Sequence, residues 1–214
     1  MTINILGTDT TDNSSSTVNT LTVAAPSGVT YQPGDLNLWY FFTANLDAVA
    51  SQQGITQQAT AGGATLLSRA YVAGDPTSYT FTLASAEFSA CQLLVCRSTY
   101  GVMGVDAAQA SPATITTPPV NATFGSDWLV LMAADHYNTS TLNAPGGFVT
   151  RVNTLLNVAG SPWVLAIADS NGPVGSPGTQ SAETFTTTGT PGAAIAAISA
   201  TLSEGRADSV VMLV

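Results

Sequence analysis

Short apolar runs separated by turn residues cover most of the 214-residue chain. Period-two alternation of apolar and polar residues predicts half-buried strands, and runs that are apolar on both faces predict central ones. The alternating segments are TLTVAA at 20–25, TLLSRAYVA at 65–73 and SYTFTLA at 78–84, and the fully apolar ones are DLNLWYFF at 35–42 and ACQLLVCRS at 90–98. Clusters of Pro, Gly and Asp between them are typical of turns.

The second half of the chain repeats the order of the first. Segment 25–42 parallels 116–135, 61–73 parallels 144–156, 77–85 parallels 161–169, and 89–99 parallels 192–202. The offset is 92 residues at Asp35/Asp127 and 84 at Gly63/Gly147, and Arg69 would correspond to Arg151. A solenoid needs three or more units. Two units instead favour a sandwich of two duplicated halves that share one core.

We therefore predict an all-β protein, an antiparallel β-sandwich of jelly-roll type with about eight to ten core strands. Residues 1–20 are expected to form an extended N-terminal arm, and 21–214 a single β-sandwich domain with halves at about 21–110 and 111–214. A frayed terminus is the alternative for the arm. Two short helical segments are predicted, at 45–54, with Asn45 as N-cap and Gly54 as terminator, and at 85–88.

The negative net charge of the chain argues against two classes of function, nucleic-acid binding and binding to anionic membranes. The chain has no lysine, four arginines and thirteen acids, for a net charge of −9. Nucleic-acid binding needs a basic surface that releases counterions from phosphates, so it is not expected. An anionic membrane surface would repel the chain, and no apolar stretch is long enough to span a bilayer. The first residues lack the basic and apolar regions of a signal peptide, so they are not expected to form one.

Two cysteines, Cys91 and Cys96, lie five residues apart in one predicted strand. Odd spacing on a strand directs their side chains to opposite faces, so they should not bond to each other. Both are expected to be reduced and buried, which fits synthesis in a cytoplasm. A disulfide between two copies of the chain is the alternative.

No segment carries a complete catalytic or metal-binding pattern. His136 is the single histidine, and Asp135 beside it would point to the opposite face of a strand, which makes it a poor triad partner. Asp35 and Asp127 follow Gly-containing turns, where an aspartate bonds to nearby backbone amides, so turn stabilisation is expected. DTTDN at 9–13 and DSNG at 169–172 offer oxygen atoms for calcium without matching a full loop, and flexible loop is the preferred interpretation.

Aromatic side chains could stack on sugars, although packing or a protein interface is the preferred role for each. The candidates are Tyr31, Tyr71, Tyr79, Tyr100, Tyr137 and Trp163. We expect no catalytic residue, no metal and no cofactor. A hydrolytic role would need two carboxylates roughly 5–10 Å apart in a cleft.

Four short segments give the chain a family resemblance: GDLNLWYFF, SDWLVLMAAD, PGGFVTR and FSACQLLVCRS. Over about 21–205 the chain resembles β-sandwich structural proteins of tailed bacteriophages, which occur in head decorations, tails and fibres. It has Ser98 where these proteins have Gly, and Phe148 where they have Trp. The resemblance implies a non-enzymatic virion component present in many copies, with ligand binding as an added role.

Both ends of the sequence carry apolar patches that a partner could cover. The expected interface residues are Ile3, Ile5, Leu6, Met212, Leu213 and Val214. The leading hypothesis is a virion structural protein that decorates head or tail, with other copies of itself, most simply as a trimer, and major virion proteins as partners. The alternative is a receptor- or glycan-binding domain of a tail fibre.

Overall fold

The computed structural model describes residues 2–13, 16–50, 52, 54–109, 115–136, 141–158, 160–187, 192 and 194–204. Within them every regular element is a strand, so the prediction of an all-β antiparallel sandwich is confirmed. The strands are β1 (Asn4–Asp12), β2 (Val18–Ala24), β3 (Leu36–Thr43), β4 (Thr56–Ala61), β5 (Ala64–Ala70), β6 (Ser78–Glu87), β7 (Ser89–Arg97), β8 (Thr99–Gln109), β9 (Ile115–Thr116), β10 (Val120–Ala122), β11 (Trp128–His136), β12 (Val149–Val158), β13 (Ser161–Pro173), β14 (Gly178–Gln180), β15 (Thr184–Phe185) and β16 (Ala194–Glu204).

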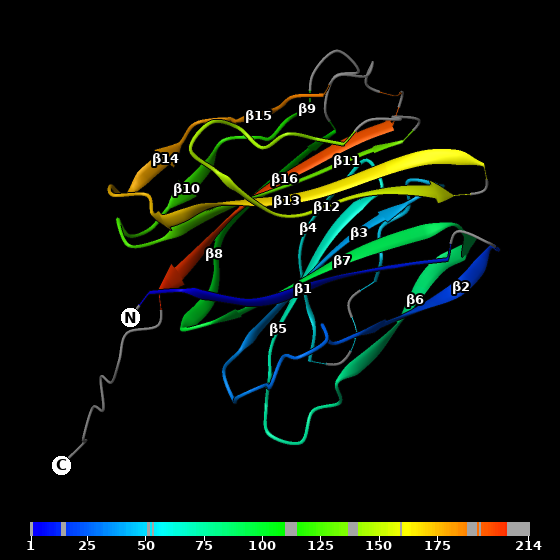
Figure 1. Ribbon diagram of the computed structural model, residues 1–214, viewed down its shortest axis with the longest axis horizontal. Helices are drawn as coiled ribbons and strands as arrows, with labels where there is room; N and C mark the ends of the chain where they lie inside the picture. The colour runs from blue at the N-terminus through cyan, green and yellow to red at the C-terminus, as the bar shows by residue number, and fades with distance from the viewer. Residues whose placement is uncertain are drawn as a thin grey trace.

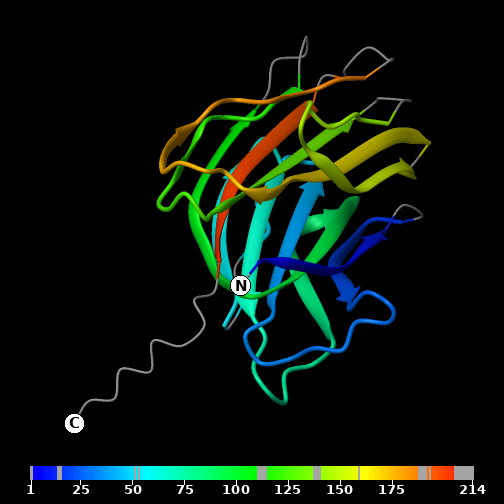
Figure 2. The same ribbon diagram turned by 60° about the vertical axis from the view of Figure 1, so that its left-hand side comes forward.

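Two five-stranded sheets lie face to face at the centre of the molecule (Figures 1 and 2). The first has the order β1-β7-β3-β5-β4 and the second the order β12-β13-β11-β16-β8. Small two-stranded pairs cover the outer faces: β2–β6 on the first sheet, and β10–β14 with β9–β15 on the second. The molecule therefore has four layers.

The strand pairings show that the chain is a duplication. The strands β8, β16, β11, β13 and β12 take the places in the second sheet that β1, β7, β3, β5 and β4 hold in the first. The outer pair is β2–β6 in the first half, and two short pairs, β10–β14 and β9–β15, take its place in the second. The predicted duplication is thus present at the level of topology, whereas the jelly-roll type stays a prediction.

The topology corrects the alignment of the two repeats. By position in the sheet, β4 corresponds to β12 and β5 to β13, so the sequence-based match of 61–73 with 144–156 is one strand out of step. Arg69 on β5 and Arg151 on β12 therefore do not correspond. Ser98, with φ 62°, lies between β7 of the first half and β8 of the second, so the repeats divide there and not near residue 110.

Three apolar clusters fill the layers. One lies between the five-stranded sheets and contains Leu38, Tyr40, Val130 and Met132. The others lie between each five-stranded sheet and its own outer pair. Because β3 and β11 are central strands, both of their faces meet a core, which explains why their sequences are apolar throughout. The two halves thus share one core and each has a second core of its own.

Buried polar groups join the two sheets across the shared core. The Tyr40 hydroxyl donates to the Ala196 carbonyl at 3.2 Å, and Gln92 Nε2 donates to the Leu165 carbonyl at 2.8 Å. At one margin, where the edge strands β1 and β12 approach, the hydroxyls of Thr10 and Thr154 are 3.1 Å apart. These directional contacts specify how one half sits on the other, which apolar packing alone does less strictly.

Three local predictions are wrong. Residues 1–20 are not a separate arm, because Asn4–Asp12 form edge strand β1, which pairs with β7, and β2 begins at Val18. The described part of 45–54 contains no helix: Leu46 has φ 61°, and the Asn45 amide is tied to Glu87. The segment 85–88 continues strand β6 to Glu87.

Candidate functional site: a groove between β8 and β10

The two turn aspartates act as predicted. Asp35 accepts a hydrogen bond from the Gln32 amide at 2.7 Å, and Asp127 accepts from the Thr123 and Phe124 amides at 2.8 and 2.9 Å. Both side chains are buried. Each carboxylate therefore fixes the turn that leads into a central strand.

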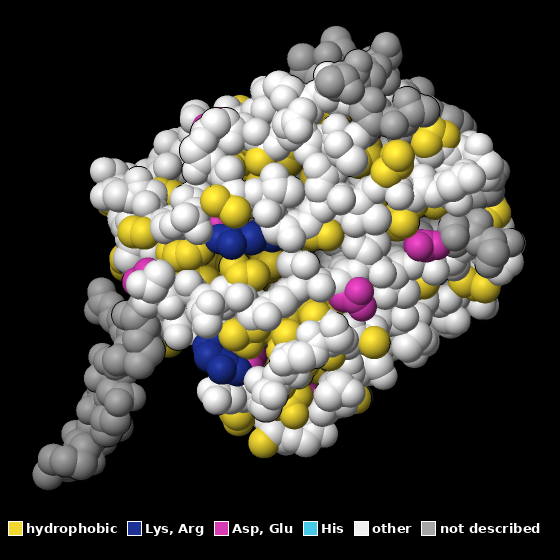
Figure 3. All heavy atoms as spheres, in the orientation of Figure 1, with side chains coloured by type: hydrophobic (Ala, Val, Ile, Leu, Met, Phe, Trp, Pro, Cys, Tyr) yellow, Lys and Arg dark blue, Asp and Glu magenta, His cyan; other side chains and the backbone are white. Residues whose placement is uncertain are grey.

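Asp35 has a second role that the sequence did not indicate. Arg97 at the end of β7 donates to both of its oxygens at 2.8 Å. Arg151 binds both oxygens of the fully buried Asp169 in the same way, and Arg69 binds Asp75. The Arg69 guanidinium lowers the pKa of Asp75. On the face drawn in Figure 3, the two visible blue groups each lie beside magenta atoms within a surface of mostly uncharged atoms.

These contacts give structural roles to residues that the sequence offered as possible calcium ligands. Asp169, from the calcium candidate 169–172, is held by Arg151, and the other candidate, 9–13, lies largely in β1. No group of three or more His, Cys, Asp or Glu side chains placed to hold a metal ion occurs in the part of the chain that the structure describes.

His136 and Asp135 end strand β11. Asp135 is buried and accepts a hydrogen bond from the Gly192 amide at 2.8 Å. The His136 ring packs edge-on against Trp163, with ring centroids 4.9 Å apart, and burial lowers its pKa. These contacts of both residues are structural ones.

The cysteines face opposite sides of β7, as predicted. Cys91 lies in the outer core of the first half and Cys96 in the shared core, and both are buried, free thiols. Burial raises the pKa of both thiols. Because the thiolate is the reactive form and neither sulfur reaches the surface, a disulfide between copies is not supported by this structure.

Most of the candidate aromatics pack within the chain. Tyr31 and Tyr71 stack with centroids 4.8 Å apart, Tyr79 meets Trp39 edge-on at 5.0 Å, and Trp163 is buried in the shared core. Tyr100 on β8 is 63% exposed. Tyr137 lies outside the described residues.

One of the predicted N-terminal interface residues, Ile3, is buried in the shared core, which corrects the prediction for this residue. Ile5 packs against the same core and Leu6 against the outer core of the first half, but both are only partly buried. A role of these two side chains in an interface stays a prediction. Met212, Leu213 and Val214 lie outside the described residues.

Glu87 is a buried acid that sequence reasoning missed. It is 2% exposed at the end of β6, and its Oε2 accepts from the Asn45 amide at 3.0 Å. Its Oε1 has no hydrogen-bond partner among the described residues. Burial raises the pKa of Glu87, and nearby Asp47 adds to the shift.

We expect Glu87→Gln to change how stability depends on pH. With a folded-state pKa above the unfolded value, wild type is relatively stabilised below about pH 4, where Glu87 is protonated in both states, and loses stability as pH rises through the raised pKa. The glutamine variant keeps a neutral side chain and should gain on wild type between acidic and neutral pH. Urea unfolding at several pH values measures this. Glu183→Gln, on a less buried acid, is the control, and an equal pH response of both variants would contradict the expectation.

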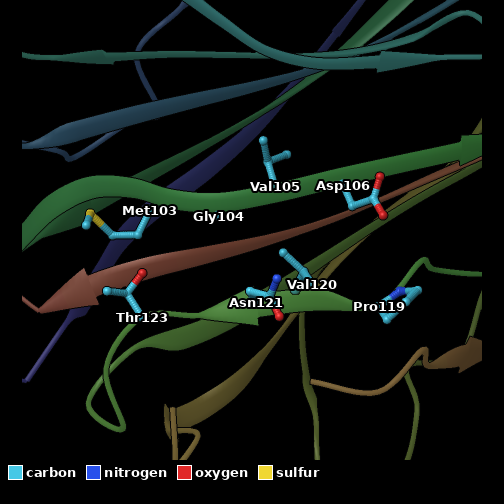
Figure 4. Close-up of a pocket in the computed structure, with 8 residues that line it drawn as sticks. All are labelled: Met103, Gly104, Val105, Asp106, Pro119, Val120, Asn121 and Thr123. Atoms are coloured by element: carbon cyan, nitrogen blue, oxygen red, sulfur yellow. The ribbon is translucent and has the colours of Figure 1, made fainter. Parts of the chain in front are cut away.

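An open groove of 340 Å³ lies between β8 and β10. In Figure 4 residues 103–106 of β8 form one wall, Pro119, Val120, Asn121 and Thr123 form the other, and β16 runs between them. Met103 is an extra residue on β8, because Thr201 and Leu202 of β16 pair with Gly104 and Val102. Such a bulge redirects a side chain, and Met103 is 45% exposed. No sequence pattern connects these two segments, so the groove was not predicted.

Backbone contacts hold the groove walls together. The Thr201 hydroxyl lies 3.2 Å from the Asn121 carbonyl oxygen and 3.4 Å from that of Gly104. A Cβ atom on Gly104 would lie 2.4 Å from the Asn121 oxygen and 2.9 Å from the Thr201 hydroxyl. Glycine is therefore what lets β10 approach β8 this closely.

Gly104→Ala should destabilise the protein by about 1–3 kcal/mol, because the new methyl group overlaps a backbone carbonyl and not a flexible side chain. Gly172→Ala is the matched control: Gly172 also lies in a strand, but a Cβ there would meet nothing within 4 Å. Chemical denaturation compares the two variants. A Gly104→Ala protein as stable as the Gly172→Ala protein would show that the close approach of β10 is absent in solution.

Comparison with known proteins gives no match to a family model, to a curated protein or to a solved structure. Among the described residues no helix is long and apolar enough to cross a membrane.

Proposed function

We propose that the protein is a non-enzymatic structural component of a tailed-phage particle, present in many copies and decorating the head or the tail. The observation that carries this proposal is the use made of its charged side chains. Asp35, Asp75 and Asp169 pair with arginines, and Asp127 and Asp135 bind backbone amides. These five acids are therefore committed to holding the fold.

The rest of the surface suits contacts with other proteins. Thr, Ser, Asn and Gln are frequent among its exposed residues, and few charged side chains lie on the face drawn in Figure 3, so contacts there would desolvate few charges. The four-layer arrangement, joined by hydrogen bonds across the shared core, supplies a rigid building block. Self-association as a trimer fits multi-copy assembly, because avidity lets weak contacts hold a subunit in place. The resemblance to phage β-sandwich proteins supports the same role.

Particle composition tests the proposal. Mass spectrometry of purified particles of the encoding phage or prophage should find the chain in many copies, and particles lacking it should take up added protein at ordered positions visible by electron microscopy. Light scattering of the purified protein should give three times the 21.7 kDa chain mass. Absence of the chain from particles would overturn the virion role, and a monomeric mass would overturn the trimer alone.

A further inference from the structure

We propose that the groove between β8 and β10 is a binding site for a neutral saccharide. This inference goes beyond the structural role and can fail independently of it. It rests on three properties of the groove: its walls are fixed, its exposed polar side chains keep hydrogen-bonding capacity that the protein does not use, and its charge disfavours the commonest alternative ligands.

The groove exists before any ligand arrives. Thr201 holds the backbones of both walls, and the Thr179 hydroxyl donates to Asn121 Oδ1 at 2.8 Å, which orients that amide. The bulge at Met103 and the bare Cα of Gly104 are local departures from regular strand structure, and they meet at this one place. A preformed site loses little conformational entropy when it binds.

Three polar groups along the groove have unused hydrogen-bonding capacity. With Asn121 Oδ1 engaged by Thr179, its Nδ2 has two N–H donors without a partner among the described residues. Asp106 Oδ1 accepts from the Ala107 amide, which leaves Oδ2 as an acceptor. Thr123 contributes a hydroxyl that can donate and accept. In Figure 4 Thr123, Asn121 and Asp106 follow one another along the groove.

A sugar ring matches this arrangement. Neighbouring hydroxyls each donate and accept, so they can satisfy a carboxylate, an amide N–H and a threonine hydroxyl together. The C–H face of the ring can pack on the exposed Met103 and on Pro119. The volume of 340 Å³ is at the lower end of the range for small-molecule sites and suits a short saccharide segment.

The charges that line the groove disfavour both anionic and cationic ligands. No arginine lines the groove, Asp106 places a carboxylate in it, and the chain carries a net charge of −9. Phosphates and sialylated or sulfated glycans would therefore be repelled. A cationic ligand generally requires an aromatic cage or several carboxylates, and the groove lining has one acid and no aromatic ring.

The first test is a glycan array followed by amide chemical-shift titration of the full chain. The array includes neutral hexose, deoxyhexose and N-acetylhexosamine glycans, and the titration uses its strongest neutral hits together with lactose and 3′-sialyllactose as a matched pair. We expect a neutral glycan to shift resonances of 103–106 and 119–123. Three outcomes would each overturn the inference: no binding of any neutral glycan, chemical-shift changes located elsewhere, or tighter binding of 3′-sialyllactose than of lactose.

Variants then test the contacts. Asp106→Asn and Thr123→Val should each weaken binding of the neutral hit on the order of tenfold, since each removes a hydrogen bond to the ligand. Asp12→Asn and Thr20→Val make the same chemical changes on β1 and β2, away from the groove, and should bind as wild type. Unchanged affinity in both groove variants would overturn the assignment. Particles should take up the two groove variants as they take up wild type. Loss of glycan binding would then be distinguishable from failure of the structural role.

Discussion

Deletion of residues 1–12 should abolish the stable fold. The deletion removes β1, an edge strand whose residues pair with β7 from Asn4 opposite Arg97 to Asp12 opposite Ala90. It also removes Ile3 from the shared core and exposes the apolar strand β7 as a new sheet edge. The expected loss is at least about 5 kcal/mol, comparable with the whole stability of many domains. Exposed apolar edges also promote aggregation.

Thermal unfolding and size-exclusion chromatography of the shortened chain measure this effect. A pair of point variants separates loss of packing from loss of chain length. Ile3→Asp places a charge in the shared core and should cost roughly 3 kcal/mol or more, whereas Thr2→Asp, one residue earlier and exposed, should stay within about 0.5 kcal/mol of wild type. A shortened chain that unfolds cooperatively near the wild-type temperature would show that residues 1–12 are dispensable, as expected of an independent arm.

The N-terminal segment shows where sequence reasoning reaches its limit. Composition made 1–20 look solvated, because Thr, Ser, Asn and Asp dominate it. This segment needs only a few apolar side chains toward the cores: Ile3 and Ile5 pack on the shared core, and Leu6 packs on the outer core of the first half. The residues that β1 pairs with on β7 lie 78 to 93 positions away in the sequence, and local pattern does not contain that pairing.

The repeat shows the same limit. The central strands were recognisable because burial on both faces leaves a run such as LNLWYFF without polar alternation. The alignment slipped because Gly-Gly pairs occur at turns in different places. Gly62-Gly63 joins β4 to β5, whereas Gly146-Gly147 precedes β12, whose equivalent is β4. The sequence of a turn indicates its local backbone geometry, but it does not indicate which strands of the sheet the turn connects.

The ion pair between Arg97 and Asp35 and the groove depend on long-range register and could not be predicted. Asp35 was recognised as a turn residue because its bond to the Gln32 amide is local, but its bond to Arg97 joins residues 62 apart. Asp106 and Asn121 lie on different strands, and the packing of β10 beside β8 brings them to one groove (Figure 4). Local chemistry was therefore visible in the sequence, and the sites assembled from distant strands were not.

Leu94→Ala and Leu131→Ala should each cost roughly 2–5 kcal/mol, because each truncation leaves a cavity in a fully buried cluster. The two leucines occupy different layers. Leu94 on β7 lies in the core shared by both halves, and Leu131 on β11 lies in the outer core of the second half. Urea unfolding gives the size of each loss. Asp127→Ala, which removes turn hydrogen bonds, should cost only about 1 kcal/mol.

Hydrogen exchange distinguishes the two layers. Leu94→Ala should lower protection in both five-stranded sheets, since the shared core holds them together. Leu131→Ala should first release the pairs β9–β15 and β10–β14, which depend on the outer core of the second half. Equal loss of protection throughout the chain in both variants would mean that the protein opens only as one cooperative unit, and a loss below about 0.5 kcal/mol in either would mean that the affected leucine is not part of a packed core.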